Sequence, residues 1–374
     1  MDADLKRERT SRALRDATLL ASHDARSLAQ RLVAAGGVPS TSRATAGKVI
    51  RHVFANDGVA AWNAETLGAV GIGAWAHETL LSMDPALSLE VEHEALATDG
   101  TLRLLLRARD GALVESVLIP GPTRTTLCVS SQVGCARACS FCETGRLGLS
   151  RQLSAGEIVD QVRIARATWA RQQDKPALSN IVFMGMGEPF DNLDEVLRAV
   201  KLLTDERGFA FAPSRVTVST VGVVDKLPAF FAGCRAELAV SLNAPDDERR
   251  RIIMPVNVRF PLAMLREALL RHVPKGRRVF FEYVLFDRFN DAPEDADLVA
   301  AWTKGIRCRV NVIPCNVGPD PALRAPSQER MNAFVARLSE HRVTTLVRRP
   351  RGCDVGGACG QLAGARRLSV LKSE

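Results

Sequence analysis

Four cysteines lie within fifteen residues of this 374-residue chain, in the stretch CVSSQVGCARACSFC from Cys128 to Cys142. Cys135, Cys139 and Cys142 have the spacing C-x3-C-x2-C. Three thiolates on one tight loop can bind three corners of a cubane iron–sulfur cluster, because soft sulfur ligands suit iron–sulfur and zinc sites. A structural zinc site needs four ligands, and no histidine lies near this loop to complete one. The spacing therefore favours a cluster with one iron left open over zinc or an incidental grouping.

The composition indicates a soluble globular protein with a polyanionic partner. Hydrophobic residues make up 46% of the chain, and its net charge of +8 with a pI near 9.2 favours nucleic acid. No apolar run approaches the ~20 residues of a membrane-spanning helix, and the first residues lack the apolar stretch of a secretory signal. We expect a cytoplasmic protein without membrane contact, whose nine cysteines are metal ligands or redox groups rather than structural disulfides.

The first third of the chain shows two patterns. Residues 1 to about 60 indicate helices, the first with a charged, solvated surface and the next ended by Gly36, Gly37 and Pro39. Residues 88–115 alternate instead, and Asp110 and Gly111 separate two apolar runs, which predicts a β-hairpin. We expect an accessory region over residues 1–120 that is helical and then forms this hairpin.

The rest of the chain predicts an α/β core. After Pro122, six short β-branched strands alternate with amphipathic helices, the first helix opening on a capping box of Ser154 and Glu157. Such alternation indicates a parallel sheet with right-handed crossovers, and hence a barrel or partial barrel. We assign this core to residues 121–354 and a C-terminal tail to residues 355–374.

Chemically unusual sequences end several of the predicted strands. The cysteine loop follows the first strand, and MGMGEP, from Met184 to Pro189, ends the second. SLN begins at Ser241, and IPCN ends at Asn316. Because the carboxyl ends of parallel strands meet at one face, where the sites of such folds lie, we expect these motifs to share a site.

The cysteine spacing resembles that of the radical S-adenosylmethionine superfamily. Phe141 before the third cysteine is typical of that superfamily, and MGMGEP resembles its GGEP-like turn. The resemblance implies a partial (β/α)6 TIM-like barrel and a [4Fe-4S] cluster held by Cys135, Cys139 and Cys142. It also implies that the open iron binds S-adenosylmethionine, whose ammonium group contacts Glu188.

Four longer motifs are more specific. CVSSQVGC, MGMGEP, IPCN and ACGQLAG are similar to motifs of the RlmN/Cfr family of RNA adenosine methyltransferases, and occur in the family's order between about Glu115 and Gly364. The resemblance implies that Cys359 receives a methyl group from one S-adenosylmethionine and passes it to adenine by radical chemistry. It implies that Glu115 accepts the ring proton. Cys128 matches the resolving thiol, which releases product by a transient disulfide with Cys359.

The same resemblance assigns further contacts to S-adenosylmethionine, namely Gly187, Glu188, Ser219, Ser241, Leu242, Asn243 and Asn316. Three positions depart from the family pattern: Asn243 stands where a histidine is usual, Cys315 replaces an aromatic residue, and Cys353 replaces an acidic one. These departures bear on substrate fit more than on the reaction. Cys353 is also a possible competitor in disulfide exchange with Cys359.

The implied partners are an RNA substrate, ribosomal or transfer RNA, and an electron donor such as flavodoxin or ferredoxin; we expect a monomer. Arginines that flank Cys359 could contact RNA phosphates, and they are Arg348, Arg349, Arg351, Arg366 and Arg367. Two other functions are open: a radical enzyme for a small molecule or peptide, and a non-catalytic iron–sulfur protein that binds RNA or transfers electrons. Carbon 2 of adenine is favoured as the target over carbon 8, which the sequence leaves open.

Overall fold

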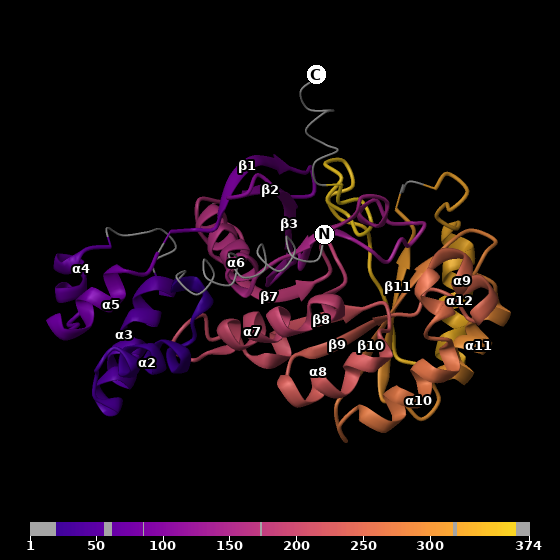
Figure 1. The fold of residues 1–374 in the computed structure, drawn as a ribbon. Helices are drawn as coiled ribbons and strands as arrows, with labels where there is room; N and C mark the ends of the chain where they lie inside the picture. The colour runs from indigo at the N-terminus through magenta and orange to yellow at the C-terminus, as the bar shows by residue number, and fades with distance from the viewer. Residues whose placement is uncertain (1–19, 56–61, 85, 173, 317–319, 364–374) are drawn as a thin grey trace, which may run out of the picture.

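The fold is built on one ten-stranded sheet with the order β1-β2-β3-β4-β7-β8-β9-β10-β11-β12 (Figure 1). The computed structural model describes residues 20–55, 62–84, 86–172, 174–316 and 320–363. Its first part is antiparallel and consists of β1 (Leu89–Leu96), β2 (Leu102–Ala108), β3 (Leu113–Pro120) and β4 (Thr125–Cys128). From β4 onward all pairs are parallel, through β7 (Leu178–Phe183), β8 (Val216–Thr220), β9 (Glu237–Ser241), β10 (Val279–Leu285), β11 (Cys308–Pro314) and β12 (Thr345–Val347).

Helices connect the parallel strands, as the alternating pattern predicts. They are α6 (Ala155–Ala170), α7 (Leu193–Thr204), α8 (Leu227–Gly233), α9 (Asp247–Ile253), α10 (Leu262–His272), α11 (Pro293–Thr303) and α12 (Gln328–Glu340). The predicted capping box at the start of α6 is present, with Ser154 and Glu157 each bonding the other's backbone. In Figure 1, α7, α8 and α10 lie along the lower side of the sheet, and the yellow C-terminal segment lies above it.

The predicted fold class, a partial barrel of alternating strands and helices, is confirmed. The sheet is open, because β1 and β12 are its two edges, so it forms a partial barrel. The predicted hairpin of β2 and β3 is present, and β3 also pairs with β4, so the hairpin continues the main sheet. β12 was not predicted, since its three residues are too few to show a pattern.

The N-terminal region is helical where it is described. Its main helices are α2 (Ala25–Ala34) and α3 (Pro39–Ala55), followed by the short α4 (Ala64–Ala69) and α5 (His77–Leu81). Their buried apolar residues belong to the same hydrophobic cluster as the core of the sheet. Residues 1–19, at the start of the predicted helical stretch, lie outside the described residues. No described helix is both long enough and apolar enough to cross a bilayer.

Candidate active site

A small hairpin that the sequence did not reveal carries the cysteine loop. β5 (Gln132–Cys135) pairs antiparallel with β6 (Gly148–Gln152), and the loop between them holds the other two cysteines of the motif. Gly134 has φ +77, and a Cβ atom there would lie 1.9 Å from the carbonyl oxygen of Gly148. Only glycine fits where the two strands approach so closely. The hairpin therefore fixes where the loop begins and ends.

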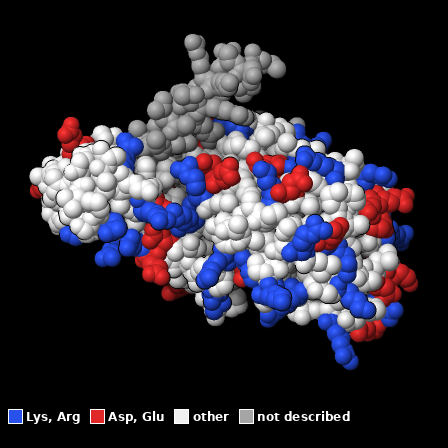
Figure 2. All heavy atoms as spheres, turned by 60° about the horizontal axis from the view of Figure 1, so that its bottom comes forward, with Lys and Arg blue, Asp and Glu red and all other residues white. Residues whose placement is uncertain are grey.

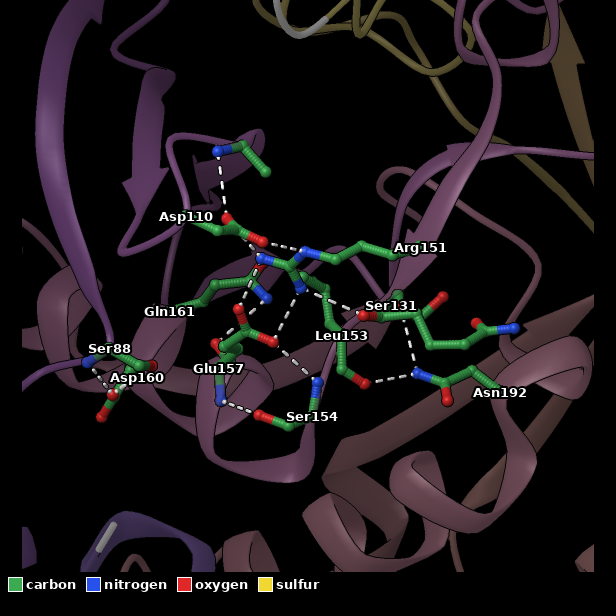
Figure 3. Close-up of polar contacts among 12 residues, drawn as sticks. Ser88, Asp110, Ser131, Arg151, Leu153, Ser154, Glu157, Asp160, Gln161 and Asn192 are labelled. Atoms are coloured by element: carbon green, nitrogen blue, oxygen red, sulfur yellow. Dashed lines mark hydrogen bonds and ion pairs between the residues drawn. The ribbon is translucent and has the colours of Figure 1, made fainter. Parts of the chain in front are cut away.

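A polar network anchors this hairpin to the rest of the fold (Figure 3). Arg151 of β6 makes ion pairs of 2.6 Å with Asp110, in the turn between β2 and β3, and of 2.8 Å with Glu157 on α6. The side-chain amide of Asn192 donates to the carbonyl oxygens of Ser131 and Leu153, at 2.8 and 2.7 Å. Arg151 thus ties β6 to α6 and to the turn between β2 and β3, and Asn192 ties both ends of the hairpin to the start of α7.

The three predicted cluster ligands face one cavity. Cys135 accepts a 3.4 Å hydrogen bond from the backbone N–H of Arg137. Burial raises the pKa of Cys135 to about 12 and that of Cys139 further, so bound metal is needed to deprotonate them at neutral pH. Within the described residues, no three His, Cys, Asp or Glu side chains gather closely enough to share one ion. Cubane ligands need no such closeness, because each binds a different iron.

The cavity opens at the carboxyl ends of the parallel strands. The cavity and the solvent space at its mouth together hold about 980 Å³. The sequence-predicted residues that line it are Cys135, Cys139, Cys142, Gly187, Glu188, Ser219, Ser241, Asn243 and Cys359. The structure thus brings together motifs spread over more than two hundred residues, as the parallel topology requires.

Glu188 is a buried carboxylate on the cavity wall. The preceding Gly187 has φ +99, and a Cβ there would lie 2.5 Å from Gln132. The carboxylate accepts hydrogen bonds from the backbone N–H groups of Phe190 at 3.0 Å and Val221 at 2.8 Å. Burial raises its pKa to about 7. A cationic ligand would favour its ionised form, so the ammonium group of S-adenosylmethionine fits this wall.

Leu242 and Asn243, two further predicted contacts of S-adenosylmethionine, also make contacts within the fold. Leu242 has its side chain in the core, and its N–H donates to the carbonyl oxygen of Glu282 at 2.9 Å. Asn243 has φ +57, a left-handed conformation that asparagine tolerates. Its side-chain oxygen accepts from the N–H of Val284 at 3.0 Å and its amide nitrogen lies 3.4 Å from the sulfur of Met254. Asn243 therefore joins β9 to β10 as well as lining the cavity.

The tail lies across the cysteine loop and presents Cys359 to the cavity. Glu143 donates its backbone N–H to the carbonyl oxygen of Gly360 at 2.8 Å. The hydroxyl of Thr144 donates to the carbonyl oxygen of Leu362 at 2.7 Å. Asn316, which lines a smaller adjoining cavity with Cys359, donates its amide to the carbonyl oxygen of Cys359 at 3.0 Å. The Cys359 side chain is open to solvent within the cavity, while the surrounding protein raises its pKa.

Cys128 lies behind the cavity wall, at the end of β4. Burial, together with the charge of Cys359, raises the pKa of Cys128 to about 12, whereas Arg348 acts to lower the pKa of both thiols. Arg348 itself lines the cavity and pairs with Glu282 at 3.2 Å. All nine cysteines are free, so the Cys128–Cys359 disulfide implied by the resemblance is absent from this state.

Glu115 is fully buried on β3 and does not line the cavity. It forms a 2.5 Å ion pair with Arg103 and accepts a 2.9 Å hydrogen bond from the N–H of Ala363. Glu282, which the sequence did not single out, also lines the cavity. Its partner Arg348 lies in the cavity wall, whereas the sequence predicted that Arg348 contacts RNA phosphates. A carboxylate inside the apolar run VFFEYVL was a signal for Glu282.

Comparisons with known proteins agree with this site. A family model described as the radical SAM superfamily matches residues 129–299. A probable RNA methyltransferase of Sorangium cellulosum is 70% identical over 363 residues, 96% of this chain and 91% of that protein. The dual-specificity RNA methyltransferase RlmN of Syntrophobacter fumaroxidans is 45% identical over 303 residues, 78% of this chain and 87% of that one. A crystal structure of a radical SAM methyltransferase from Sphaerobacter thermophilus is 38% identical, has a TM-score of 0.82, and covers 92% of this chain and 99% of that chain.

An open, mostly parallel sheet, a C-x3-C-x2-C loop after its first parallel strand and a cavity at the strand ends define a radical SAM enzyme. The cofactors of that class are a [4Fe-4S] cluster and S-adenosylmethionine, as the cysteine spacing predicted. Within the class, the chain belongs to the RlmN family of radical SAM RNA methyltransferases.

Proposed function

We propose that this protein methylates a ring carbon of adenosine in RNA, carbon 2 being favoured, and that Cys359 carries the methyl group. One observation carries this proposal: Cys359 lines the same cavity as Cys135, Cys139 and Cys142 and the strand ends assigned to S-adenosylmethionine. A radical enzyme for a small molecule or peptide has no need of a thiol at that place.

The residues around Cys359 have separate tasks in this proposal. When bound, the cluster and S-adenosylmethionine supply the methyl group and a 5′-deoxyadenosyl radical next to Cys359. The cavity wall around Glu188 orients S-adenosylmethionine, and Glu115 accepts the proton that leaves the ring. The Cys128 thiol then forms a bond to the Cys359 sulfur, which releases the methylated RNA and leaves a disulfide for an external reductant. Arg348 favours the thiolate form of both cysteines.

Ribosomal RNA, transfer RNA or both are the proposed substrates, since relatives are named dual-specificity RNA methyltransferases. On the lower face of the molecule, Lys and Arg alternate with Asp and Glu rather than forming a uniform positive patch (Figure 2). We therefore place the RNA over the mouth of the cavity, near the tail. Flavodoxin or ferredoxin is the proposed electron donor, and a cytoplasmic monomer the proposed state.

We also propose that the chain is organised as an accessory region over residues 1–120, a radical SAM core over 121–354 and a tail over 355–374. The sheet is continuous across the first boundary, because β3 pairs with β4. Glu115 lies in the accessory region and Cys359 in the tail. All three segments are therefore needed for the proposed reaction.

The deciding experiment compares the wild-type protein with C359A and the matched control C234A, whose cysteine is half-buried at the end of α8, away from the cavity. Each protein is loaded with iron and sulfide under nitrogen and given reductant, S-adenosylmethionine and RNA from a strain that lacks the gene. We expect 2-methyladenosine by mass spectrometry with wild type and C234A, and none with C359A at equal iron content. Methylation by C359A would refute the carrier role, and deoxyadenosine release without RNA methylation would indicate another substrate.

A further inference from the structure

Arg250, on α9, is a buried arginine that the proposed reaction does not use. Its side chain is 0% exposed. The guanidinium donates to the backbone carbonyl oxygens of Val221 at 2.7 Å, Ser241 at 3.0 Å and Leu242 at 3.0 Å, and to the side-chain oxygen of Asn257 at 2.8 Å. Every one of these acceptors is neutral. Among the described side chains, no carboxylate forms an ion pair with Arg250.

A charge buried in this way needs a counter-charge. Moving an ion out of water costs several kcal/mol even after the protein relaxes, and neutral hydrogen bonds recover only part of that cost. Burial lowers the pKa of Arg250 to about 10, so the group still carries its charge at neutral pH. The fold therefore keeps a permanent positive charge beneath the ends of β8 and β9.

The cysteine loop lies directly against α9. The backbone N–H of Ser140, next to Cys139, donates to the carbonyl oxygen of Ile253 on α9 at 3.1 Å. Two anionic groups act on Arg250 by their charge: Cys139 in the loop and Asp247, whose carboxylate accepts a 2.8 Å hydrogen bond from the side chain of Asn257. The positive charge of Arg250 thus faces the ligands of the cluster from the core side.

We propose that Arg250 is the counter-charge of the iron–sulfur cluster and raises its reduction potential. A cubane held by three thiolates has a net negative charge, which grows by one when an electron is added. A fixed positive charge in a medium of low dielectric constant stabilises the more negative state, and net charge is one of the factors that set the potential of such clusters. Arg250 is therefore a positioning and tuning residue that acts through the cluster.

The same guanidinium also holds the strand ends that line the cavity, so charge and hydrogen bonding must be separated. R250K and R250M form a matched pair, since the two new side chains have nearly the same length and differ by the charge. Both lose most of the hydrogen bonds to Val221, Ser241 and Leu242. Any difference between these two variants in cluster properties therefore reports the charge.

The test is a redox titration of the loaded proteins, followed by electron paramagnetic resonance of the reduced cluster, without RNA. We expect R250M to have a lower potential than R250K, by at least the 59 mV that correspond to a tenfold change in a one-electron equilibrium. The wild-type potential should lie near that of R250K. Equal potentials in R250K and R250M would overturn the proposal.

Thermal unfolding of the proteins without cluster covers the case in which R250M takes up no iron. R250K and R250M both lose most of the hydrogen bonds of Arg250, so, if Arg250 serves the cluster, unloaded R250M should be at least as stable as unloaded R250K. Loss of iron uptake by R250M alone then supports the proposal. If unloaded R250M is less stable than unloaded R250K, or if R250K loses iron to the same extent, Arg250 serves the fold and the proposal fails. None of these measurements depends on the RNA substrate.

Discussion

Glu115 accepts a 2.9 Å hydrogen bond from the backbone N–H of Ala363, which joins the hairpin strand β3 to the tail four residues beyond Cys359. Its other oxygen pairs with Arg103 at 2.5 Å, and both side chains are buried. The carboxylate proposed as proton acceptor therefore also holds the tail in place. A simple substitution of Glu115 confounds the two roles.

A charge-neutral double variant separates these roles. We expect E115Q alone to lower the free energy of unfolding by about 3 kcal/mol, because it leaves Arg103 buried without its partner. R103M/E115Q removes both charges, keeps an amide oxygen for the N–H of Ala363, and should recover much of that loss in urea titrations. Methylation should stay at least about 10²-fold below wild type in both, as for a missing general base. Recovery of methylation in the double variant would refute Glu115 as proton acceptor.

The hydrogen bond from Asn316 to Cys359 gives a second prediction. N316A removes the 3.0 Å bond to the carbonyl oxygen of Cys359. A net loss of ~1 kcal/mol should make local opening of the tail about fivefold more frequent. Hydrogen–deuterium exchange of the peptide over 355–363 measures this rate. The matched control N332A changes an exposed asparagine on α12 and should leave it unchanged; equal exchange in both variants would contradict the prediction.

The elements that the sequence predicted well are those with local signals. The strands β7 to β11 are short apolar runs, and α6 begins at the capping box formed by Ser154 and Glu157. The hairpin of β5 and β6 has no such signal, because its strands are short and β6 is largely exposed. Its pairing depends on Gly134, whose conformation only the folded structure reveals.

The residues of the candidate site likewise fall into those that a local motif identifies and those that only the fold reveals. The cluster cysteines and Cys359 stand in motifs, so type and spacing identify them. Arg348 meets Glu282 across 66 residues, a pairing that depends on which strands become neighbours. Arg250 stands in the run DERRR, where nothing distinguishes the one buried arginine from the exposed or partly exposed ones beside it. Single-sequence patterns reveal ligands but not the charges that support them.

Cys353 supplies a third prediction, about disulfide exchange. Its exposed thiol lies 3.7 Å from the side-chain oxygen of Asn316, whose amide nitrogen bonds the carbonyl oxygen of Cys359. Partial burial raises the pKa of Cys353, and the charge of Cys359 acts in the same direction. We expect C128S to accumulate a Cys353–Cys359 disulfide on mild oxidation, because the competing thiol is missing. C353S should methylate RNA within about twofold of wild type, since an exposed thiol outside the cavity is not needed for the reaction.

Peptide mapping without reductant checks this exchange. Wild type should show mainly the Cys128–Cys359 pair after oxidation, and C128S/C353S should show neither pair. If C128S forms no Cys353–Cys359 disulfide, the two thiols do not meet, and Cys353 is no competitor.

Glu188 makes binding of S-adenosylmethionine depend on pH. Burial, together with the charge of Asp191, raises its pKa from 4.5 to about 7. The folded protein without ligand therefore holds a proton that the unfolded chain releases near pH 4.5, so its stability falls as pH rises from there to about 7. An ammonium group beside Glu188 favours the ionised form. Ligand binding then expels the proton, and the dissociation constant should fall about tenfold per pH unit up to about pH 7 and level off above it.

Equilibrium dialysis with the cluster-loaded protein, between about pH 5.5 and pH 7.5, measures this dependence below the pH at which the ligand's own α-amino group loses its proton. E188Q cannot ionise, so we expect weaker binding with a flat profile across the same range. E267Q is the matched control, because it removes a carboxylate that is 68% exposed on α10 and should keep the wild-type slope. A slope that persists in E188Q would assign the titration to another group, such as the neighbouring Cys135, and would remove Glu188 from the ammonium site.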